Sequence, residues 1–288
     1  MPHEIDNRRF DFLIQAPMPE PAQDSALHVP ETSSVPPTIP EEQEALFREV
    51  LTLFEDRKLP YAVAGAFALR EHTGICRDTK DLDIFLTSQN VVPALESLRE
   101  EGFECEVCDP VWLHKARRDG YFVDLITGMS NAAIIVEDSW VKRSVPATVY
   151  GVQTQVLAPE ELLASKLFVT RRERFDGADI AHIIYGTQGK LKWERILELT
   201  GEHWEILLWA LILFRYSYPA QTQYVPKKLW DELLIRFRDA IYQPQPSAKF
   251  RGSLVDDKMF AIDVNEWGLE NLMLDYRQRR LQNLPEMP

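Results

Sequence analysis

The sequence predicts an α+β fold in which helices flank a mixed sheet, followed by a mostly helical carboxy-terminal region. Three observations lead to this prediction. Between residues 41 and 158, short apolar runs of strand length alternate with stretches that repeat apolar residues at helical spacing. From Pro159 onward, almost every apolar repeat has helical spacing. The 288 residues, of which 45% are hydrophobic, are enough to bury a core of this size.

The first forty residues differ in composition from the rest of the chain. They are rich in proline, serine and acidic residues and hold few large apolar side chains, which is typical of disordered tails. Pro40 is followed by Glu41 and Glu42, the acidic first turn of a helix that should end near Lys58. The sequence therefore predicts three parts: a tail (1–40), a mixed-sheet domain (41–158) and a helical domain (159–288).

Within the mixed-sheet domain, a glycine separates the first strand from the next helix. Gly65 stops the apolar run 61–64 and is followed by residues with helical spacing. The strands expected here are 61–64, 82–86, 103–107, 111–115, 121–126 and 149–157, with helices at 66–72 and 91–101. In the helical domain, helices are expected at 159–173, 176–185, 193–199, 204–216, 227–242 and 269–281.

The net charge and the length of the apolar runs argue against two classes of protein, those that coat nucleic acid and those that span a membrane. The net charge of −13 disfavours a protein that coats a long polyanion, since such binding depends on many Lys and Arg contacts to phosphates. The longest apolar run, 206–214, falls well short of the ~20 residues of a membrane-spanning helix. No basic segment followed by an apolar one stands at the amino terminus, so we expect a cytoplasmic protein. The three cysteines are expected to be reduced thiols.

Two acidic residues stand at the start of an expected apolar strand. Asp81 and Asp83 are two positions apart, so their side chains point to the same face of the strand and repel each other unless a cation lies between them. Asp83 is flanked by apolar residues on both sides, and an unpaired buried carboxylate is costly. We therefore favour a metal-binding role over the alternative of a solvated acidic strand edge.

A third acid repeats this pattern. Asp124 lies inside the apolar run 121–126, so it could complete a cradle for one or two Mg²⁺ ions. Two ions about 3.5–4 Å apart can clamp the attacking and leaving oxygens of a phosphoryl displacement. Asp124 is also the candidate to accept the proton of an attacking hydroxyl. The alternative is a buried ion pair with a basic neighbour such as Arg117.

Gly65 and Lys166 are candidates for contact with an anionic ligand. A glycine at a strand-to-helix turn lets phosphate oxygens approach the backbone and the helix amino terminus, although many such glycines serve the turn alone. Lys166 projects from the apolar face of the helix expected at 159–173. Its alternative role is a snorkelling stem whose ammonium group reaches solvent.

These residues carry a resemblance to a known superfamily. The segment Gly65-Ala66, followed by Arg77-Asp78-Thr79-Lys80-Asp81-Leu82-Asp83, resembles the glycine turn and Asp-x-Asp signature of the polymerase-beta-like nucleotidyltransferases. Its Arg-x-Thr-x-Asp-x-Asp form is similar to the bacterial minimal nucleotidyltransferases and the AbiEii-type toxin family. The resemblance spans about residues 45–186. The family usually has Gly-Gly or Gly-Ser in the turn, where this chain has Gly65-Ala66.

The resemblance implies a sheet of the nucleotidyltransferase type and transfer of a nucleoside monophosphate from an NTP to an acceptor hydroxyl. Asp81, Asp83 and Asp124 would be catalytic and would bind Mg²⁺, with two ions expected. The implied nucleotide-binding residues are Gly65, Ala66, Lys166 and Asp179, with Lys166 at the phosphates and Asp179 supporting the site. The implied acceptor is a tRNA 3′ end, a protein or a small molecule, and the toxin family adds a cognate antitoxin as a partner.

Other interpretations stay open at this stage. Asp176 and Asp179 could equally be a helix cap and a first-turn acid. The Gly65-Ala66 turn supports a second functional class, a catalytically weak protein of the same fold that binds nucleotide and acts in regulation or interaction. A third class, an antitoxin-like or structural partner, would neither bind nor turn over nucleotide. Nucleotide binding and pyrophosphate release distinguish these classes.

Overall fold

A computed structural model describes residues 39–77 and 79–285. The tail expected at residues 1–40 lies outside the described residues, except for its last two. The first helix, α1 (Glu41–Asp56), begins directly after Pro40 with the acidic first turn that the sequence predicts. Most of its apolar face is buried, with Phe47, Val50 and Phe54 at 0% exposure, while Leu53 is partly buried.

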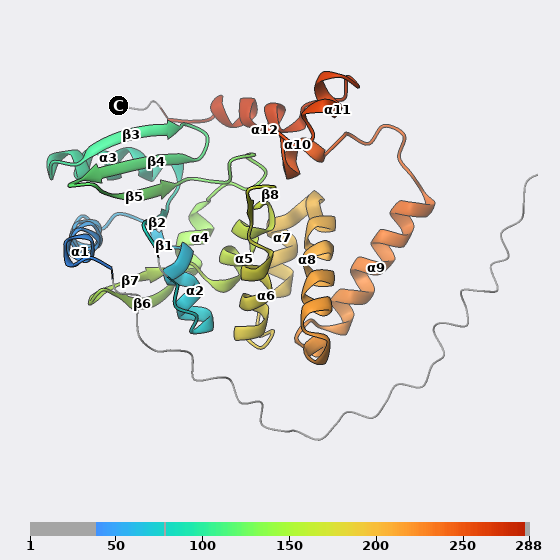
Figure 1. The fold of residues 1–288 in the computed structure, drawn as a ribbon, viewed down its shortest axis with the longest axis horizontal. Helices are drawn as coiled ribbons and strands as arrows, with labels where there is room; N and C mark the ends of the chain where they lie inside the picture. The colour runs from blue at the N-terminus through green and yellow to red at the C-terminus, as the bar shows by residue number, and fades with distance from the viewer. Residues whose placement is uncertain (1–38, 78, 286–288) are drawn as a thin grey trace, which may run out of the picture. The chain divides into compact units, whose positions relative to one another are not determined.

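The chain builds one seven-stranded mixed sheet. Its strand order is β3-β4-β5-β2-β1-β7-β6 (Figure 1). The pairs β2/β5 and β1/β7 are parallel, and the other neighbours are antiparallel. The strands are β1 (Ala62–Val63), β2 (Leu82–Phe85), β3 (Glu104–Asp109), β4 (Leu113–Arg118), β5 (Tyr121–Ile126), β6 (Val145–Val149) and β7 (Val152–Val156).

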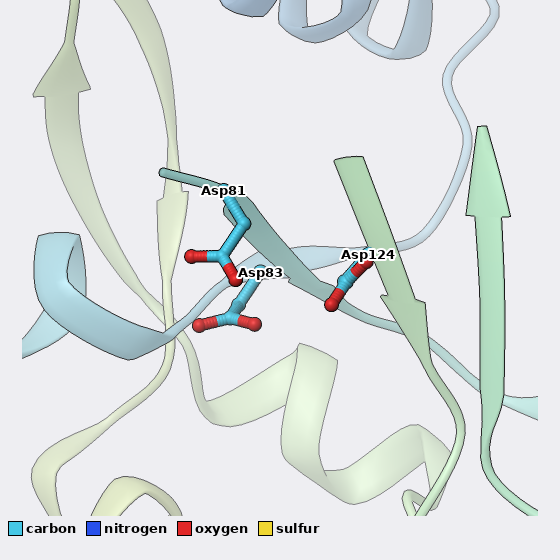
Figure 2. Close-up of side chains that lie close together, drawn as sticks. All are labelled: Asp81, Asp83 and Asp124. Carbon is cyan, nitrogen blue, oxygen red and sulfur yellow. The ribbon is translucent and has the colours of Figure 1, made fainter. Parts of the chain in front are cut away.

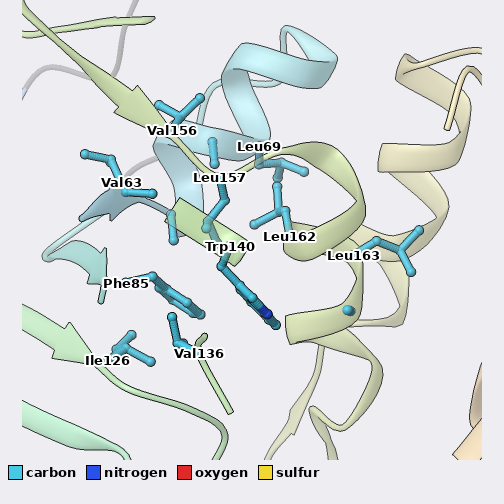
Figure 3. Close-up of a cluster of buried hydrophobic side chains, with 14 of the residues drawn as sticks. Val63, Leu69, Phe85, Ile126, Val136, Trp140, Val156, Leu157, Leu162 and Leu163 are labelled. Carbon is cyan, nitrogen blue, oxygen red and sulfur yellow. The ribbon is translucent and has the colours of Figure 1, made fainter. Parts of the chain in front are cut away.

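Helices pack on the sheet in two groups. Helix α1 contacts β5, β7 and α3 (Ser88–Glu100), which in turn contacts β3. Helix α2 (Gly65–Thr73) contacts β2 and β7 and joins the sheet to the helical region through α5 (Pro159–Leu167) and α6 (Gly177–Gly186). The short helix α4 (Asp138–Arg143) carries Trp140, whose ring stacks on Phe85 at 6.1 Å (Figure 3).

The region after residue 158 is mostly helical. It continues with α7 (Trp193–Thr200), α8 (Trp204–Ser217), α9 (Lys227–Tyr242), α10 (Gly252–Val255), α11 (Ala261–Asn265) and α12 (Leu272–Leu281). The α+β fold predicted from the sequence is thus confirmed. Buried side chains on both sides of residue 158 join one hydrophobic core, and the domain division at 158/159 stays a prediction.

Two predicted elements were wrong in extent. The helix expected at 159–173 ends at Leu167 and is followed by a small hairpin, β8 (Thr170–Arg171) and β9 (Arg174–Phe175). Four consecutive charged residues, 171–174, offer no apolar face on which the helix could continue. The strand expected at 149–157 is the second half of a hairpin, because Tyr150 and Gly151 both have positive φ and turn the chain between β6 and β7.

Smaller differences follow from weak local signals. Strand β4 is shifted towards its charged end relative to the prediction of 111–115, and helices α4, α10 and α11 were not predicted. Each of these three helices has six residues or fewer, too short for a helical repeat to show in the sequence. Among the described residues, no helix combines the length and apolar character needed to cross a bilayer.

Candidate active site

The three predicted acids converge on the central strands of the sheet. Asp83 on β2 and Asp124 on β5 are direct partners in the parallel register, so both side chains leave the same face. Asp81 stands one residue before β2 and two before Asp83, which places it on that face as well. One carboxylate oxygen from each of the three lies within 4.8 Å of the others (Figure 2).

This arrangement destabilises the ionised carboxylate of Asp83. Burial, and then the like charges of Asp81 and Asp124, raise the pKa of Asp83 to about 7. Burial also raises the pKa of Asp124, against the opposing effect of a nearby lysine. Three carboxylates so close together therefore need additional positive charge to be stable in their ionised forms.

Gly65 lies directly against this cluster. Its φ of +55° is a conformation that side chains with a Cβ rarely adopt, and a Cβ added there would stand 1.9 Å from Oδ2 of Asp83. The glycine is therefore needed for the approach of the α2 amino terminus to the carboxylate, in addition to the turn. Helix α2 has no side-chain cap, and both Gly65 and Ala66 line the cavity described below.

Asp124 has an ionic partner, although a different one from the arginine considered in the sequence. Lys115, its direct partner across the β4/β5 register, forms an ion pair with its Oδ1. Arg117 instead pairs with Glu106 at 3.5 Å and lies over the ring of Phe122. The ion pair with Lys115 therefore supports the alternative in which Asp124 has a purely structural role.

Lys166 does not snorkel to solvent. Only 8% of the residue is exposed, and its Nζ lies 2.8 Å from Asp176 and 2.9 Å from Asp179. Although burial alone would raise the pKa of Asp176, the charges of Lys166 and Arg174 outweigh it and lower that pKa. Asp176 occupies the N-cap position of α6 but makes no capping hydrogen bond, so its side chain serves the ion pairs.

Two arginines extend these pairs into a continuous network. Arg77, from the loop before β2, pairs with Asp179, and Arg174 on β9 pairs with Asp176 at 3.2 Å. The chain of contacts Arg77, Asp179, Lys166, Asp176, Arg174 has one more positive than negative charge and stands beside the acidic cluster.

A single cavity contains both groups of charges. Its volume is about 480 Å³, and all seven residues predicted for the site line it: Gly65, Ala66, Asp81, Asp83, Asp124, Lys166 and Asp179. Thr79 also lines it and donates a 2.9 Å hydrogen bond to Oδ1 of Asp81, which orients that carboxylate. An apolar wall completes the cavity with Trp112, Ile126, Met129, Phe168 and Val169.

Sequence reasoning missed several of these residues as parts of the site. Thr79 and Arg77 stood in the quoted motif, so their spacing from Asp81 was the available signal. Lys115 became visible only through the strand register. Arg174 stands in the arginine-rich turn after Lys166, which is part of the resemblance to the toxin family, but its place in the site came from the hairpin. The apolar wall left no signal, because its residues also fit an ordinary core.

The acidic cluster fits a divalent metal ion. Three carboxylates on one face offer the oxygen ligands that Mg²⁺ prefers. A cation between them would favour the ionised form of Asp83, which burial and then the neighbouring acids disfavour. Within residues 39–77 and 79–285, no other group of three acidic, His or Cys side chains comes together in this way. Cys76, Cys105 and Cys108 are free thiols, as the sequence predicted.

Structural comparison finds several nucleotidyltransferases. An antigenic nucleotidyltransferase-like protein from Paracoccidioides brasiliensis is 18% identical, with 64% of this chain and 93% of that chain covered and a TM-score of 0.43. The lincosamide antibiotic adenylyltransferase LnuA is 19% identical, with 50% and 96% covered and a TM-score of 0.36. A Thermotoga maritima protein named as a putative nucleotidyltransferase is 15% identical, with 43% and 82% covered and a TM-score of 0.34. No curated protein sequence matches the chain.

A family model gives the stronger result. It matches residues 43–202, which include the whole sheet, the acidic cluster, the β8–β9 hairpin and α6. This span is more than half of the chain. The chain therefore belongs to the family described as nucleotidyl transferase of unknown function (DUF2204).

Proposed function

We propose that the protein transfers a nucleoside monophosphate from an NTP to an acceptor hydroxyl, with Mg²⁺ bound by Asp81, Asp83 and Asp124. The observation that carries this proposal is the convergence of three carboxylates, the glycine turn and several cations in one cavity. Mg²⁺ ions held there would neutralise charge that develops on the phosphate oxygens during transfer. Metal dependence itself is part of the proposal.

In the proposed reaction the acceptor oxygen bonds to the α-phosphorus, and the bond from that phosphorus to the pyrophosphate oxygen breaks. The hydroxyl proton goes to the carboxylate of Asp124, which acts as the general base. The ion pair with Lys115 engages Oδ1 and orients the group. Thr79 orients Asp81 in the same way. The chain's contribution is therefore mainly positioning and charge stabilisation.

The structure changes the role that we propose for Lys166. Its ammonium group already has two carboxylate partners, so its first task is to hold Asp176 and Asp179 together. We propose that the network as a whole, with its excess positive charge, faces the phosphates. Asp179 then supports the site by holding Lys166 and Arg77.

The test is incubation of the purified protein with each labelled NTP, Mg²⁺ and three acceptor pools: total RNA, protein and small molecules. Pyrophosphate release and label in one pool are expected for the wild type, and loss of both for Asp83→Asn. Nucleotide binding without pyrophosphate release would favour the regulatory alternative that the Gly65-Ala66 turn supports. Absence of binding to every NTP would overturn both.

The resemblance to AbiEii-type toxins also yields a proposal, in which a cognate antitoxin is a partner. Expression of the wild type would then arrest growth, and Asp83→Asn would relieve the arrest. Equal growth with both proteins, at equal expression, would contradict the toxin proposal without affecting nucleotide transfer.

A further inference from the structure

The β8–β9 hairpin presents the most exposed cation of the cavity. Among the basic residues that line it, Arg174 has 69% of its side chain exposed, compared with 45% for Arg77, 25% for Arg171 and 10% for Lys166. Asp81 and Asp83 contribute to the electrostatic environment of its guanidinium. Arg174 is therefore the cation best placed to meet an incoming anionic ligand.

The hairpin has little support of its own. It pairs only two residues on each strand, and its tip residues Arg172 and Glu173 are exposed. A two-stranded hairpin of this size is at best marginally stable in water. Its position must therefore depend on contacts with other parts of the chain.

Two such contacts lie elsewhere: Arg171 donates to the Ser130 hydroxyl at 3.1 Å, and the ring centroids of Phe175 and Trp209 on α8 are 6.1 Å apart. The others come from a short carboxy-terminal segment, Val255–Lys258, which we call the clamp. Each of four successive hairpin residues meets it. The Thr170 hydroxyl donates to the Val255 carbonyl at 3.2 Å, and Arg171 pairs with Asp257 at 3.2 Å. The backbone N–H of Arg172 donates to Oδ2 of Asp256 at 2.9 Å, and Lys258 donates to Glu173 at 3.0 Å.

The clamp is itself anchored elsewhere. Leu254, just before it, is buried, and its carbonyl accepts a 2.8 Å hydrogen bond from Asn131. On α12, Arg277 donates to both carboxylate oxygens of Asp109 at 3.0 Å and to the Ser130 carbonyl at 2.7 Å. Helices α10 and α12, which lie near β8 in Figure 1, are thus attached to Asp109, Ser130 and Asn131 through bonds that do not involve the hairpin.

We propose that the clamp holds the β8–β9 hairpin where Arg174 faces the nucleotide phosphates, and that Asp256 is thereby a positioning residue for nucleotide binding. The inference rests on the proposed nucleotidyltransferase function. It also gives a role to a segment that lies outside the region matched by the family model, which ends at residue 202. Asp256 does not touch the nucleotide; it acts through Arg172 and the hairpin.

The two oxygens of Asp256 allow a selective test. Oδ1 accepts the backbone N–H groups of Lys258 and Met259 and shapes the clamp, whereas Oδ2 accepts the N–H of Arg172. In Asp256→Asn, a carbonyl oxygen can keep the first role while the amide nitrogen cannot accept the second bond. The substitution should therefore release the hairpin and preserve the clamp.

The binding of each NTP with Mg²⁺ should be titrated for five proteins: the wild type, Asp256→Asn, Arg174→Gln, the double variant and a control. We expect Asp256→Asn to weaken binding about threefold to tenfold, the equivalent of one net hydrogen bond. In an Arg174→Gln background it should add nothing, because the cation that the clamp positions is already gone. The matched control, Asp263→Asn on α11, removes the same charge from a side chain without a hydrogen bond or ion pair among the described residues and should bind like wild type.

A second readout needs no nucleotide. Amide hydrogen exchange across residues 169–176 should be faster in Asp256→Asn than in wild type and unchanged in Asp263→Asn. Unchanged exchange in Asp256→Asn, or an equal loss of binding with and without Arg174, would overturn the clamp. If the wild type binds no NTP, the proposed function fails, and the exchange measurement still decides whether the clamp holds the hairpin.

Discussion

Replacing Lys166 by methionine tests the charge network most directly. The substitution keeps the apolar stem and removes the ammonium group that lies within 2.9 Å of both Asp176 and Asp179. A lysine that only contacted a phosphate would, on this change, weaken nucleotide binding without lowering stability, and a snorkelling lysine would alter neither much. The structure leads to a different expectation, because the two carboxylates would remain in a largely buried site.

The magnitude follows from the contacts. Removing one partner of a buried ion pair costs about 3–5 kcal/mol, since the remaining charge stays uncompensated. Here each carboxylate keeps one arginine, Arg174 for Asp176 and Arg77 for Asp179. We therefore expect Lys166→Met to lower the free energy of unfolding by about 2–3 kcal/mol, below the full cost of an unpaired charge.

Urea denaturation of the wild type, Lys166→Met, and Lys166→Met combined with Asp176→Asn and Asp179→Asn measures this cost. The triple variant removes the stranded charges and should recover part of the lost stability, because neutral amides cost less to bury than unpaired carboxylates. A change below about 0.5 kcal/mol in the single variant is typical of a surface substitution, and it would refute the network. Failure of the triple variant to recover would point to lost packing instead.

Three further predictions concern the acidic cluster. Without metal, Asp83→Asn should raise the free energy of unfolding by about 2–4 kcal/mol at pH 8, because the pKa of Asp83 in the folded protein is raised to about 7. This gain in stability should shrink as the pH falls towards 5. A difference in urea denaturation that does not depend on pH would contradict this prediction. Gly65→Ala should lower the melting temperature and abolish nucleotide binding, since the new Cβ meets Asp83; wild-type affinity would show that the turn can shift. Lys115→Met removes the charge that lowers the pKa of Asp124, so the acidic limb of the kcat/KM profile should move to higher pH, and an unmoved limb would argue against Asp124 as the base.

The acidic residues of the site could be predicted from the local sequence pattern, because burying a carboxylate in an apolar strand is costly whatever that strand pairs with. A carboxylate inside an apolar strand, such as Asp83 or Asp124, departs from the composition of a buried strand wherever that strand pairs. The parallel register that aligns Asp83 with Asp124 was not visible in the sequence, since many registers satisfy the same apolar pattern.

The partners of charged groups were harder to predict. Arg117 and Lys115 are both near Asp124 in the sequence and both basic, and only the β4/β5 register selects Lys115. For Lys166 the sequence left open a phosphate contact and a snorkelling stem. Its partners, Asp176 and Asp179, stand beyond the hairpin, part of which was predicted to be helical.

The sequence by itself determined which segments would be strands and helices in most of the chain, that acids would occur in two of the strands, and that a glycine would precede α2. These are consequences of periodicity, burial and backbone freedom within a few residues. Only the tertiary structure decided which cations neutralise which carboxylates, and that a segment some 85 residues further along the chain would support the β8–β9 hairpin. Such contacts depend on strand register and on close approach between distant segments, and short-range pattern carries no information about either.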